Sequence, residues 1–296
     1  MDHTVETPPT SLSDPLRWNL LQRKAQEWKV SRAFTIFREQ GIEPILIKGW
    51  AAGIHYPASH LRASIDMDLA VSSSDFEKAA YIARDAVSEG LAIDLHRELR
   101  HLDTVDWSDL SSNSLTIDVD GNPIRVLCHE DHLRVLCVHW LTDGGLHRER
   151  LWDIYYLVDN TRSEFDWERF LGPVSKTRRR WLVCTLGIAS RYLNLDLSGT
   201  PIDEEAKNLP DWLIKCVEKN WKSGFKHVPL EVALFRPKEL FIQLGNRLFP
   251  NPISSTIDME GSFDAPTRVH YKLGSFIKRI APSLHRIRST VRQRAT

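Results

Sequence analysis

The sequence predicts an α/β (α+β) fold in which a small mixed-sheet core is followed by a helical C-terminal part. Between residues 44 and 99, apolar runs and helical segments alternate in the order strand, helix, strand, helix, strand, which is typical of an α/β sheet. A hairpin pattern follows, and from Glu130 onward the apolar residues recur at helical spacing. With 296 residues and 42% hydrophobic content, the chain can bury one large core or two modest ones.

The first part of the chain is expected to contain three helices, three strands and the hairpin. A helix is predicted to begin at Asp14-Pro15, where an N-cap acceptor precedes proline at the first helical position, and to end at Gly41. The hairpin is expected to turn at Asp120-Gly121-Asn122-Pro123. The other strands are expected at 44–47, 65–71 and 91–99, the hairpin strands at 115–119 and 124–127, and the other helices at 50–56 and 74–89.

The second part of the chain is expected to be helical throughout. Apolar spacing predicts helices over 131–142, 148–159, 167–171, 177–193, 204–218, 237–248 and 269–291, the last interrupted at Pro282. The predicted organisation is therefore a disordered tail over 1–13, a core with an N-terminal helix over 14–128, and a helical domain with a basic last helix over 129–296.

Charge is balanced over the whole chain but not along it. Lys and Arg total 39, as do Asp and Glu, so the net charge does not predict a nucleic-acid binder. From Thr267 onward there are eight Lys or Arg residues and no acidic residue. A basic amphipathic helix there can contact RNA, anionic lipid or another anionic partner, and the alternative is a packed terminal helix with a solvated basic face. Its apolar positions are Ile277, Ile280, Leu284, Ile287 and Val291.

The lack of targeting signals in the sequence, together with its cysteine usage, predicts a cytoplasmic protein. No apolar run approaches the ~20 residues that a membrane span needs. The N-terminal segment lacks the basic and apolar regions of a signal peptide. The four cysteines are dispersed on apolar stretches without a CxxC pair, which is typical of buried thiols in a reducing compartment.

The alternating acidic and apolar residues of 65–71 carry the strongest chemical signal. In a strand, Asp66 and Asp68 lie on the same face, about 6.5–7 Å apart. Neighbouring carboxylates repel one another, and a divalent cation such as Mg²⁺ or Mn²⁺ removes that cost. Asp94, between apolar residues on the next strand, can bring a third carboxylate and allow two metal ions. The alternative is a solvated acidic strand face.

Four further residues are candidates for binding the substrate. A strand that ends at Lys48-Gly49 before a helix can present backbone N–H groups to phosphate, with Lys48 as a point charge; the glycine can equally serve only a tight turn. Arg62 can hold a phosphate with two donors, or be a surface arginine. His96 shares a strand face with Asp94 and can contact the acceptor or a phosphate.

The remaining histidines give weaker signals. His129 and His132 are three residues apart and do not form an HExxH motif, so they do not predict zinc. His139 stands among apolar residues and is expected to be a core histidine. The sequence assigns no role to His139 or to Asp153.

Together these motifs resemble the bacterial family of uncharacterised nucleotidyltransferases, within the DNA polymerase β-like superfamily. The resemblance covers about residues 30–160 and continues, less specifically, to a helix with His139 and another with Leu151-Trp152-Asp153. The motifs that carry it are, in order, Ile47-Lys48-Gly49, Tyr56-Pro57, Leu61-Arg62, Asp66-Met67-Asp68-Leu69 and Ile93-Asp94-Leu95-His96.

The resemblance implies transfer of a nucleoside monophosphate from an NTP, expected to be ATP, to an acceptor hydroxyl with release of pyrophosphate. Asp66 and Asp68 would be the metal pair and Asp94 the third carboxylate, serving as general base or acting on the attacking hydroxyl through the metal. Lys48 and Gly49 stand where better-known members have a Gly-Ser or Gly-Gly phosphate-binding turn. The acceptor can be a small molecule, a peptide, a protein or RNA. Two alternatives are a non-catalytic nucleotide-binding or complex-subunit protein and a metal-dependent phosphohydrolase.

Overall fold

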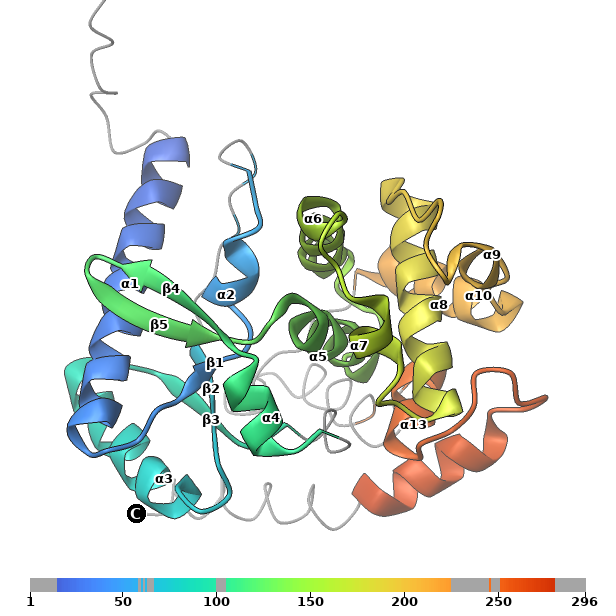
Figure 1. Cartoon of the computed structure of the whole chain (residues 1–296). Coiled ribbons are helices and arrows are strands. Elements are labelled where there is room, and N and C mark those ends of the chain that lie inside the picture. Colours follow the sequence, from blue (N-terminus) through green and yellow to red (C-terminus); the bar gives the residue numbers. More distant parts are fainter. Residues whose placement is uncertain are drawn as a thin grey trace, which may run out of the picture. The chain divides into compact units, whose positions relative to one another are not determined.

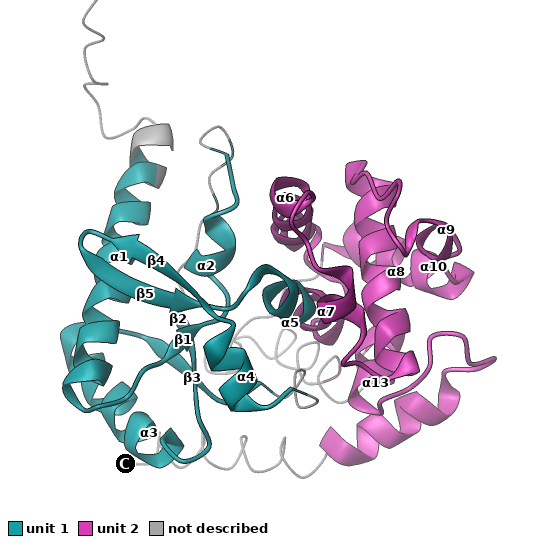
Figure 2. Cartoon of the chain, in the orientation of Figure 1, with its two compact units in different colours: residues 1–135 teal, residues 136–296 magenta. Residues whose placement is uncertain are grey.

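The computed structural model of the chain describes residues 15–57, 60, 62, 67–99, 105–224, 245 and 251–279 (Figure 1). Contacts divide the chain into two compact units, residues 1–135 and residues 136–296 (Figure 2). Helix α5 (His129–Thr142) begins in the first unit and ends in the second. The predicted domain boundary at 128/129 stays a prediction, and the expected tail over 1–13 lies outside the described residues.

A five-stranded mixed sheet forms the centre of the first unit, in the order β3-β2-β1-β5-β4. The β2/β3 and β1/β5 pairs are parallel, and the β1/β2 and β4/β5 pairs are antiparallel. This sheet, followed by helices, confirms the predicted α+β class. The strands are β1 (Ile45–Leu46), β2 (Met67–Val71), β3 (Ile93–Arg97), β4 (Leu115–Val119) and β5 (Asn122–Val126).

The main core of this unit lies between one face of the sheet and two helices, α1 (Pro15–Glu39) and α3 (Phe76–Asp85). Strand β2 is buried along its whole length. Because side chains alternate along a strand, Met67, Leu69 and Val71 enter this core, whereas Asp68 and Ala70 face the other side. The face with Ala70 packs against α4 (Trp107–Ser112), a helix that the sequence did not predict.

The β4–β5 hairpin turns on two residues rather than four. Asp120 and Gly121 both have positive φ, 52° and 82°, which is the conformation that favours Asp-Gly in a two-residue hairpin turn. The expected inclusion of Asn122 and Pro123 in the turn is wrong, because Asn122 pairs with Val119 and Pro123 pairs in the ladder. The Asn122 side chain instead donates to the α1 backbone, where it fixes the start of β5.

Two short elements complete the first unit. Helix α2 (Trp50–Gly53) follows β1 directly, within the predicted helix 50–56. The predicted helix 74–89 forms as α3 followed by a 3₁₀ turn, η1 (Ala86–Glu89), which ends at Gly90 in the left-handed conformation. The left-handed residue ends the helix because glycine adopts this conformation at little cost.

The second unit contains helices throughout its described part. The predicted helix 204–218 is wrong as one element: the chain forms α9 and α10 with Pro210 between them, since proline cannot continue a helix. Helix α13 (Pro252–Asp258) was not predicted, although Asn251 caps it and Pro252 opens it. The elements are η3 (Arg148–Arg150), α6 (Leu151–Thr161), α7 (Trp167–Leu171), α8 (Lys176–Leu193), α9 (Asp203–Lys207), α10 (Asp211–Ser223) and α13 (Pro252–Asp258).

Two predicted helices near the C-terminus are only partly within the described residues. Of 237–248, only residue 245 is described, and of 269–291, residues 269–279 are described and are helical. No helix in the described part of the chain combines the length and the apolar character that a membrane crossing requires.

Candidate active site

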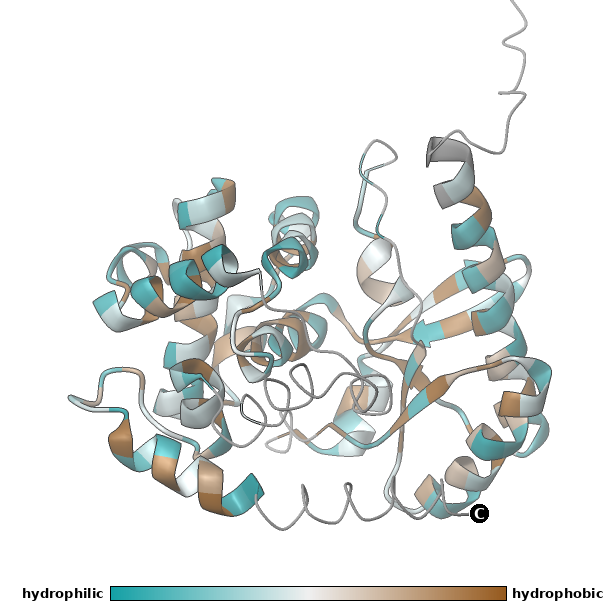
Figure 3. Cartoon of the chain, turned by 180° about the vertical axis from the view of Figure 1, so that it is seen from behind, coloured by the Kyte–Doolittle hydropathy of each residue, from teal (hydrophilic) through white to brown (hydrophobic). Residues whose placement is uncertain are grey.

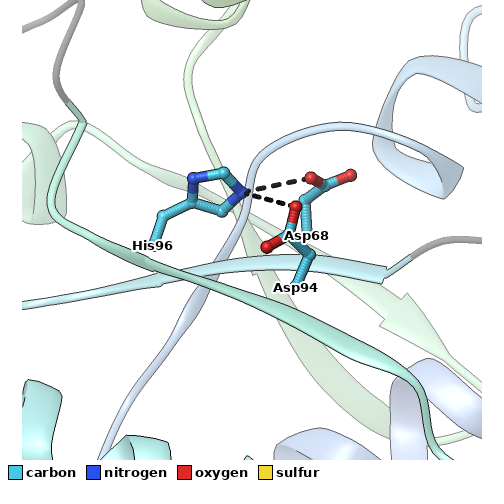
Figure 4. A group of neighbouring side chains, drawn as sticks. All are labelled: Asp68, Asp94 and His96. Atoms are coloured by element: carbon cyan, nitrogen blue, oxygen red, sulfur yellow. Dashed lines mark hydrogen bonds and ion pairs between the residues drawn. The ribbon is translucent and has the colours of Figure 1, made fainter. Parts of the chain in front are cut away.

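Asp68 and Asp94 extend from neighbouring parallel strands at the same level of the sheet. They are direct register partners on β2 and β3, so their side chains point to the same face (Figure 4). His96, two residues beyond Asp94, points to that face as well. Its Nε2 lies 3.1 Å from Oδ1 of Asp68 and 3.5 Å from Oδ2 of Asp94. The expected pairing of the two acidic strands is therefore present.

Lys48 completes this group from the end of β1. The Ile47 N–H donates to the backbone oxygen of Asp68 at 3.1 Å, which brings the next residue beside the carboxylate. The Nζ of Lys48 lies 2.7 Å from Oδ1 of Asp68, and only 13% of the lysine side chain and 9% of the aspartate side chain are exposed. The same carboxylate oxygen thus contacts both Lys48 and His96.

The electrostatics of the group favour its charged form. Burial would raise the pKa of Asp68, but the hydrogen bond with His96 and the charge and hydrogen bond of Lys48 outweigh burial and lower the pKa to about 2. The hydrogen bond with His96 also lowers the pKa of Asp94. Hydrogen bonds with Asp68 and Asp94 raise the pKa of His96 to about 9. At neutral pH the two carboxylates are therefore balanced by an imidazolium and an ammonium.

The two carboxylates differ in access. The Asp68 side chain is 9% exposed and the Asp94 side chain is 67% exposed. Asp68 is held from two sides, whereas Asp94 can be reached from solvent. The structure thus separates an anchored carboxylate from an accessible one.

Asp68 and Asp94, together with His96 once it has given up its proton, are a chemically suitable donor set for a divalent metal. Within the described ranges they form the group of three candidate ligands whose donor atoms all lie within 4.8 Å of one another. Carboxylate oxygens suit Mg²⁺ and Mn²⁺, and an imidazole nitrogen is acceptable to Mn²⁺. His96, expected at the substrate, is thus brought into the carboxylate group itself.

The other predicted site residues fall in three places. Asp66 lies outside the described residues, so its role stays a prediction. Gly49 precedes α2 with φ 63° and ψ −114°, a backbone conformation that requires glycine. Arg62 lies against α2, with its Cβ 3.7 Å from the position a Cβ on Gly53 would take. Phosphate contacts by Lys48, Gly49 and Arg62 remain predictions.

A second group, of three histidines, lies elsewhere in the first unit. The ring of His55 is 5.4 Å from that of His129 and 6.3 Å from that of His132. His132 is 2% exposed, and its Nε2 has no hydrogen-bond partner among the residues that the structure describes. Burial and, secondarily, neighbouring positive groups lower the pKa of His55 to about 4 and that of His132 to about 3. The sequence spacing pointed to His129 and His132 but not to His55, which comes close to them only in the folded chain.

His139 and Asp153 belong to the second unit. The expectation of a core position for His139 is wrong, because its side chain is 33% exposed. Arg150 donates to Nε2 of His139 at 2.7 Å and contacts Asp143 at 2.5 Å. A polar partner on the next helical element therefore accounts for this histidine among apolar neighbours. Asp153 is buried, 3% exposed.

A mixed sheet followed by helices, with carboxylates side by side on its strands, is the arrangement that the nucleotidyltransferase motifs of the sequence led us to expect. Residues 2–194 match the family described as "Uncharacterised nucleotidyltransferase", which is more than half of the 296-residue chain. The chain belongs to that family, which confirms the resemblance found in its motifs. The match extends through the end of α8. Comparison with curated proteins and with solved structures gave no match.

Proposed function

We propose that the protein is an enzyme that transfers a nucleoside monophosphate from an NTP to an acceptor hydroxyl and releases pyrophosphate. The observation that carries this proposal is the convergence of Asp68, Asp94 and His96 on one sheet face in a chain of the nucleotidyltransferase family. ATP is the expected donor. Mg²⁺ or Mn²⁺ is the expected metal, because the donor set is dominated by carboxylate oxygen.

Asp68 is proposed to anchor the metal, together with Asp66 and Asp94. Its low exposure and its low pKa of about 2 support this role, because it stays ionised across the physiological range. A divalent ion bound there supplies charge stabilisation for the phosphoryl group and orients the attacking and leaving oxygens. The chain's own contribution is to hold the carboxylate oxygens of Asp68 and Asp94 at fixed positions on the sheet.

Lys48 is proposed to exchange partners when substrate is bound. Without metal, its ammonium neutralises Asp68 at 2.7 Å. If Asp68 held a divalent cation, the carboxylate would no longer need the ammonium as a counter-charge, and Lys48 would be repelled from it. Lys48 stands between β1 and the Gly49 turn, so its released ammonium can contact the phosphates of the incoming NTP.

Asp94 and His96 are proposed to serve the acceptor side. Asp94 is the exposed carboxylate of the pair, so an acceptor hydroxyl can reach it and transfer its proton. His96 positions Asp94 by its contact with Oδ2 and keeps it ionised. The assay described next identifies the acceptor class, which can be a small molecule, a peptide, a protein or RNA.

The test is incubation of the full-length protein with NTPs labelled at the α- or the γ-phosphate, with Mg²⁺ or Mn²⁺ and a cell extract as source of acceptor. We expect the α-label to move to an acceptor and the γ-label to leave with pyrophosphate. Asp68→Asn serves as the inactive control, and Asp85→Asn, at an exposed acid of α3, as the matched active one.

Other outcomes of this assay assign other functions. Label released only as nucleotide or phosphate, without an acceptor, would identify a phosphohydrolase. Metal-dependent NTP binding without any turnover in the presence of extract would favour a non-catalytic nucleotide-binding protein. Activity unchanged in Asp68→Asn would refute the proposed site.

A further inference from the structure

The helix over residues 269–279 contacts the rest of the second unit through its polar side. The Ser275 hydroxyl donates to Oδ2 of Asp258 at 2.6 Å, and Nε of Arg279 donates to the same oxygen at 2.6 Å. The backbone N–H of Ser262 donates to the hydroxyl of Tyr271 at 3.0 Å. In Figure 1 this is the red helix that follows α13. Polar bonds to the end of α13 thus fix which side of the helix faces the protein.

The opposite side of this helix carries an exposed apolar stripe. Val269, Leu273 and Ile277 are spaced four residues apart, so they lie on one face. Their exposed fractions are 62%, 59% and 69%. An amphipathic helix on a globular protein normally buries its apolar stripe. Here the arrangement is reversed, and Figure 3 shows hydrophobic and hydrophilic bands alternating along this helix.

The charge of this segment defines the partner that fits the stripe. From Thr267 to the end there are eight basic residues and no acidic one, in a chain of net charge zero. Lys272 and Lys278 are exposed within the helix. Beyond residue 279, outside the described part, the sequence keeps apolar residues at spacings of three or four, at Ile280, Leu284, Ile287 and Val291. The partner must therefore offer both apolar surface and negative charge.

We propose that the helix over residues 269–279 binds the surface of an anionic membrane, without spanning it. The apolar stripe would lie among the upper acyl chains, and the exposed Lys272 and Lys278 side chains would contact lipid phosphates. Nucleic acid would satisfy the charges but would leave Val269, Leu273 and Ile277 in water, so lipid fits better. This inference is independent of the proposed enzymatic activity.

The test is flotation of the full-length protein with vesicles of phosphatidylcholine, alone or mixed with phosphatidylglycerol. We expect binding to the mixed vesicles at least about tenfold stronger than to the neutral ones, and weaker binding as salt rises. The double variant Leu273→Gln/Ile277→Gln should lose about tenfold or more of that affinity. Lys272→Gln/Lys278→Gln should lose binding at low salt and show a flatter salt dependence.

A matched control comes from exposed hydrophobic residues outside the helix. Tyr81 and Val87 are 70% and 64% exposed on α3 and η1. Tyr81→Gln/Val87→Gln should bind mixed vesicles as the unmodified protein does, and all variants should keep its thermal unfolding midpoint. Equal binding to both vesicle types, or no binding, would overturn the proposal. So would a stripe-dependent self-association, or RNA binding lost in Leu273→Gln/Ile277→Gln in place of vesicle binding.

Discussion

Asp68 and Asp94 lie side by side on the parallel strands β2 and β3, and a single atom, Nε2 of His96, contacts both carboxylates. The sheet register sets their separation, and the imidazole holds them together without a metal. Their difference in exposure, 9% against 67%, leads to different expected roles.

Replacing each carboxylate by its amide should separate these roles. In Asp68→Asn we expect metal affinity and transfer to fall together, because an anchoring charge is lost. In Asp94→Asn we expect NTP–metal affinity to be largely kept, because Asp66 and Asp68 would still hold a metal ion. Transfer should fall by ~10²–10⁴-fold, because a proton acceptor acts mainly in the transition state. Calorimetry with Mg²⁺–NTP alongside the transfer assay measures both. Full activity in Asp94→Asn would remove Asp94 from the reaction.

Lys48→Gln should change metal and nucleotide affinity in opposite directions. Removing the ammonium 2.7 Å from Asp68 removes a competitor for the cation, so Mn²⁺ alone should bind more tightly. NTP should bind less tightly if Lys48 contacts phosphate. The metal-free protein should lose roughly 1–3 kcal/mol of stability, because the buried Asp68 carboxylate then keeps, within the described part of the chain, His96 alone as a cationic partner. Lys78→Gln, at an exposed lysine, is the control, and parallel changes in both affinities would contradict the exchange of partners.

Stability should fall with pH through His132. Its pKa is about 3 in the folded protein, against an ordinary value of 6.5 for histidine, so the unfolded chain takes up the proton first as pH falls. The neutral-histidine contribution is complete above pH 6.5 and is lost progressively below it. At pH 5 this amounts to about 2 kcal/mol. Urea unfolding between pH 7 and pH 5 measures it.

The His132→Gln variant supplies the comparison for that measurement. Its free energy of unfolding should depend less on pH over the same interval, by about the same 2 kcal/mol, because glutamine does not titrate. His147→Gln, at a partly exposed histidine of the second unit, should keep the full slope. An unchanged slope in His132→Gln would mean that other groups carry the acid sensitivity.

Gly49→Ala should destabilise the protein. Gly49 has φ 63° and ψ −114°, which an alanine adopts only under strain, so we expect a loss of about 1–3 kcal/mol. Gly53→Ala is the matched control in the same segment, because Gly53 is not among the positive-φ glycines and a Cβ there makes an ordinary 3.7 Å contact with Arg62. It should change stability by at most about 1 kcal/mol. Thermal unfolding of the two variants decides, and equal stability would show that the turn relaxes.

Local sequence patterns predicted the parts of the site that lie on single strands. The alternation around Asp68 and around Asp94 predicted the side of the strand on which each carboxylate lies, and the two come together because β2 pairs with β3. The Lys48–Asp68 ion pair could not be predicted, because it depends on β1 pairing antiparallel to β2, which no local pattern records. The contact between His55 and His132 could not be predicted either, because the two residues come together only in the folded chain. These contacts are tertiary, and residue spacing carries no information about them.

For the helices too, local signals in the sequence mark the boundaries, whereas orientation depends on tertiary contacts. Pro210, which separates α9 from α10, and Asn251-Pro252, which open α13, are local signals that were readable but not used. The helix over 269–279 was predicted from its spacing, yet spacing does not tell which side faces the protein. That orientation came from Asp258, a partner in another helix.

The shortness of β1 has a consequence for how the sheet opens. β1 joins the β3-β2 pair to the β5-β4 hairpin, and its register with β5 is the single pair Leu46–Val126. The hairpin is held as much by Arg38 of α1, which donates to the Asn122 side chain and to the Pro123 carbonyl. Amide hydrogen exchange should therefore show two separate groups of amides, divided at the β1–β5 pairing. We expect β4 and β5 to exchange together as one cooperative unit, while the amides of Asp68, Asp94 and His96 on β2 and β3 stay protected.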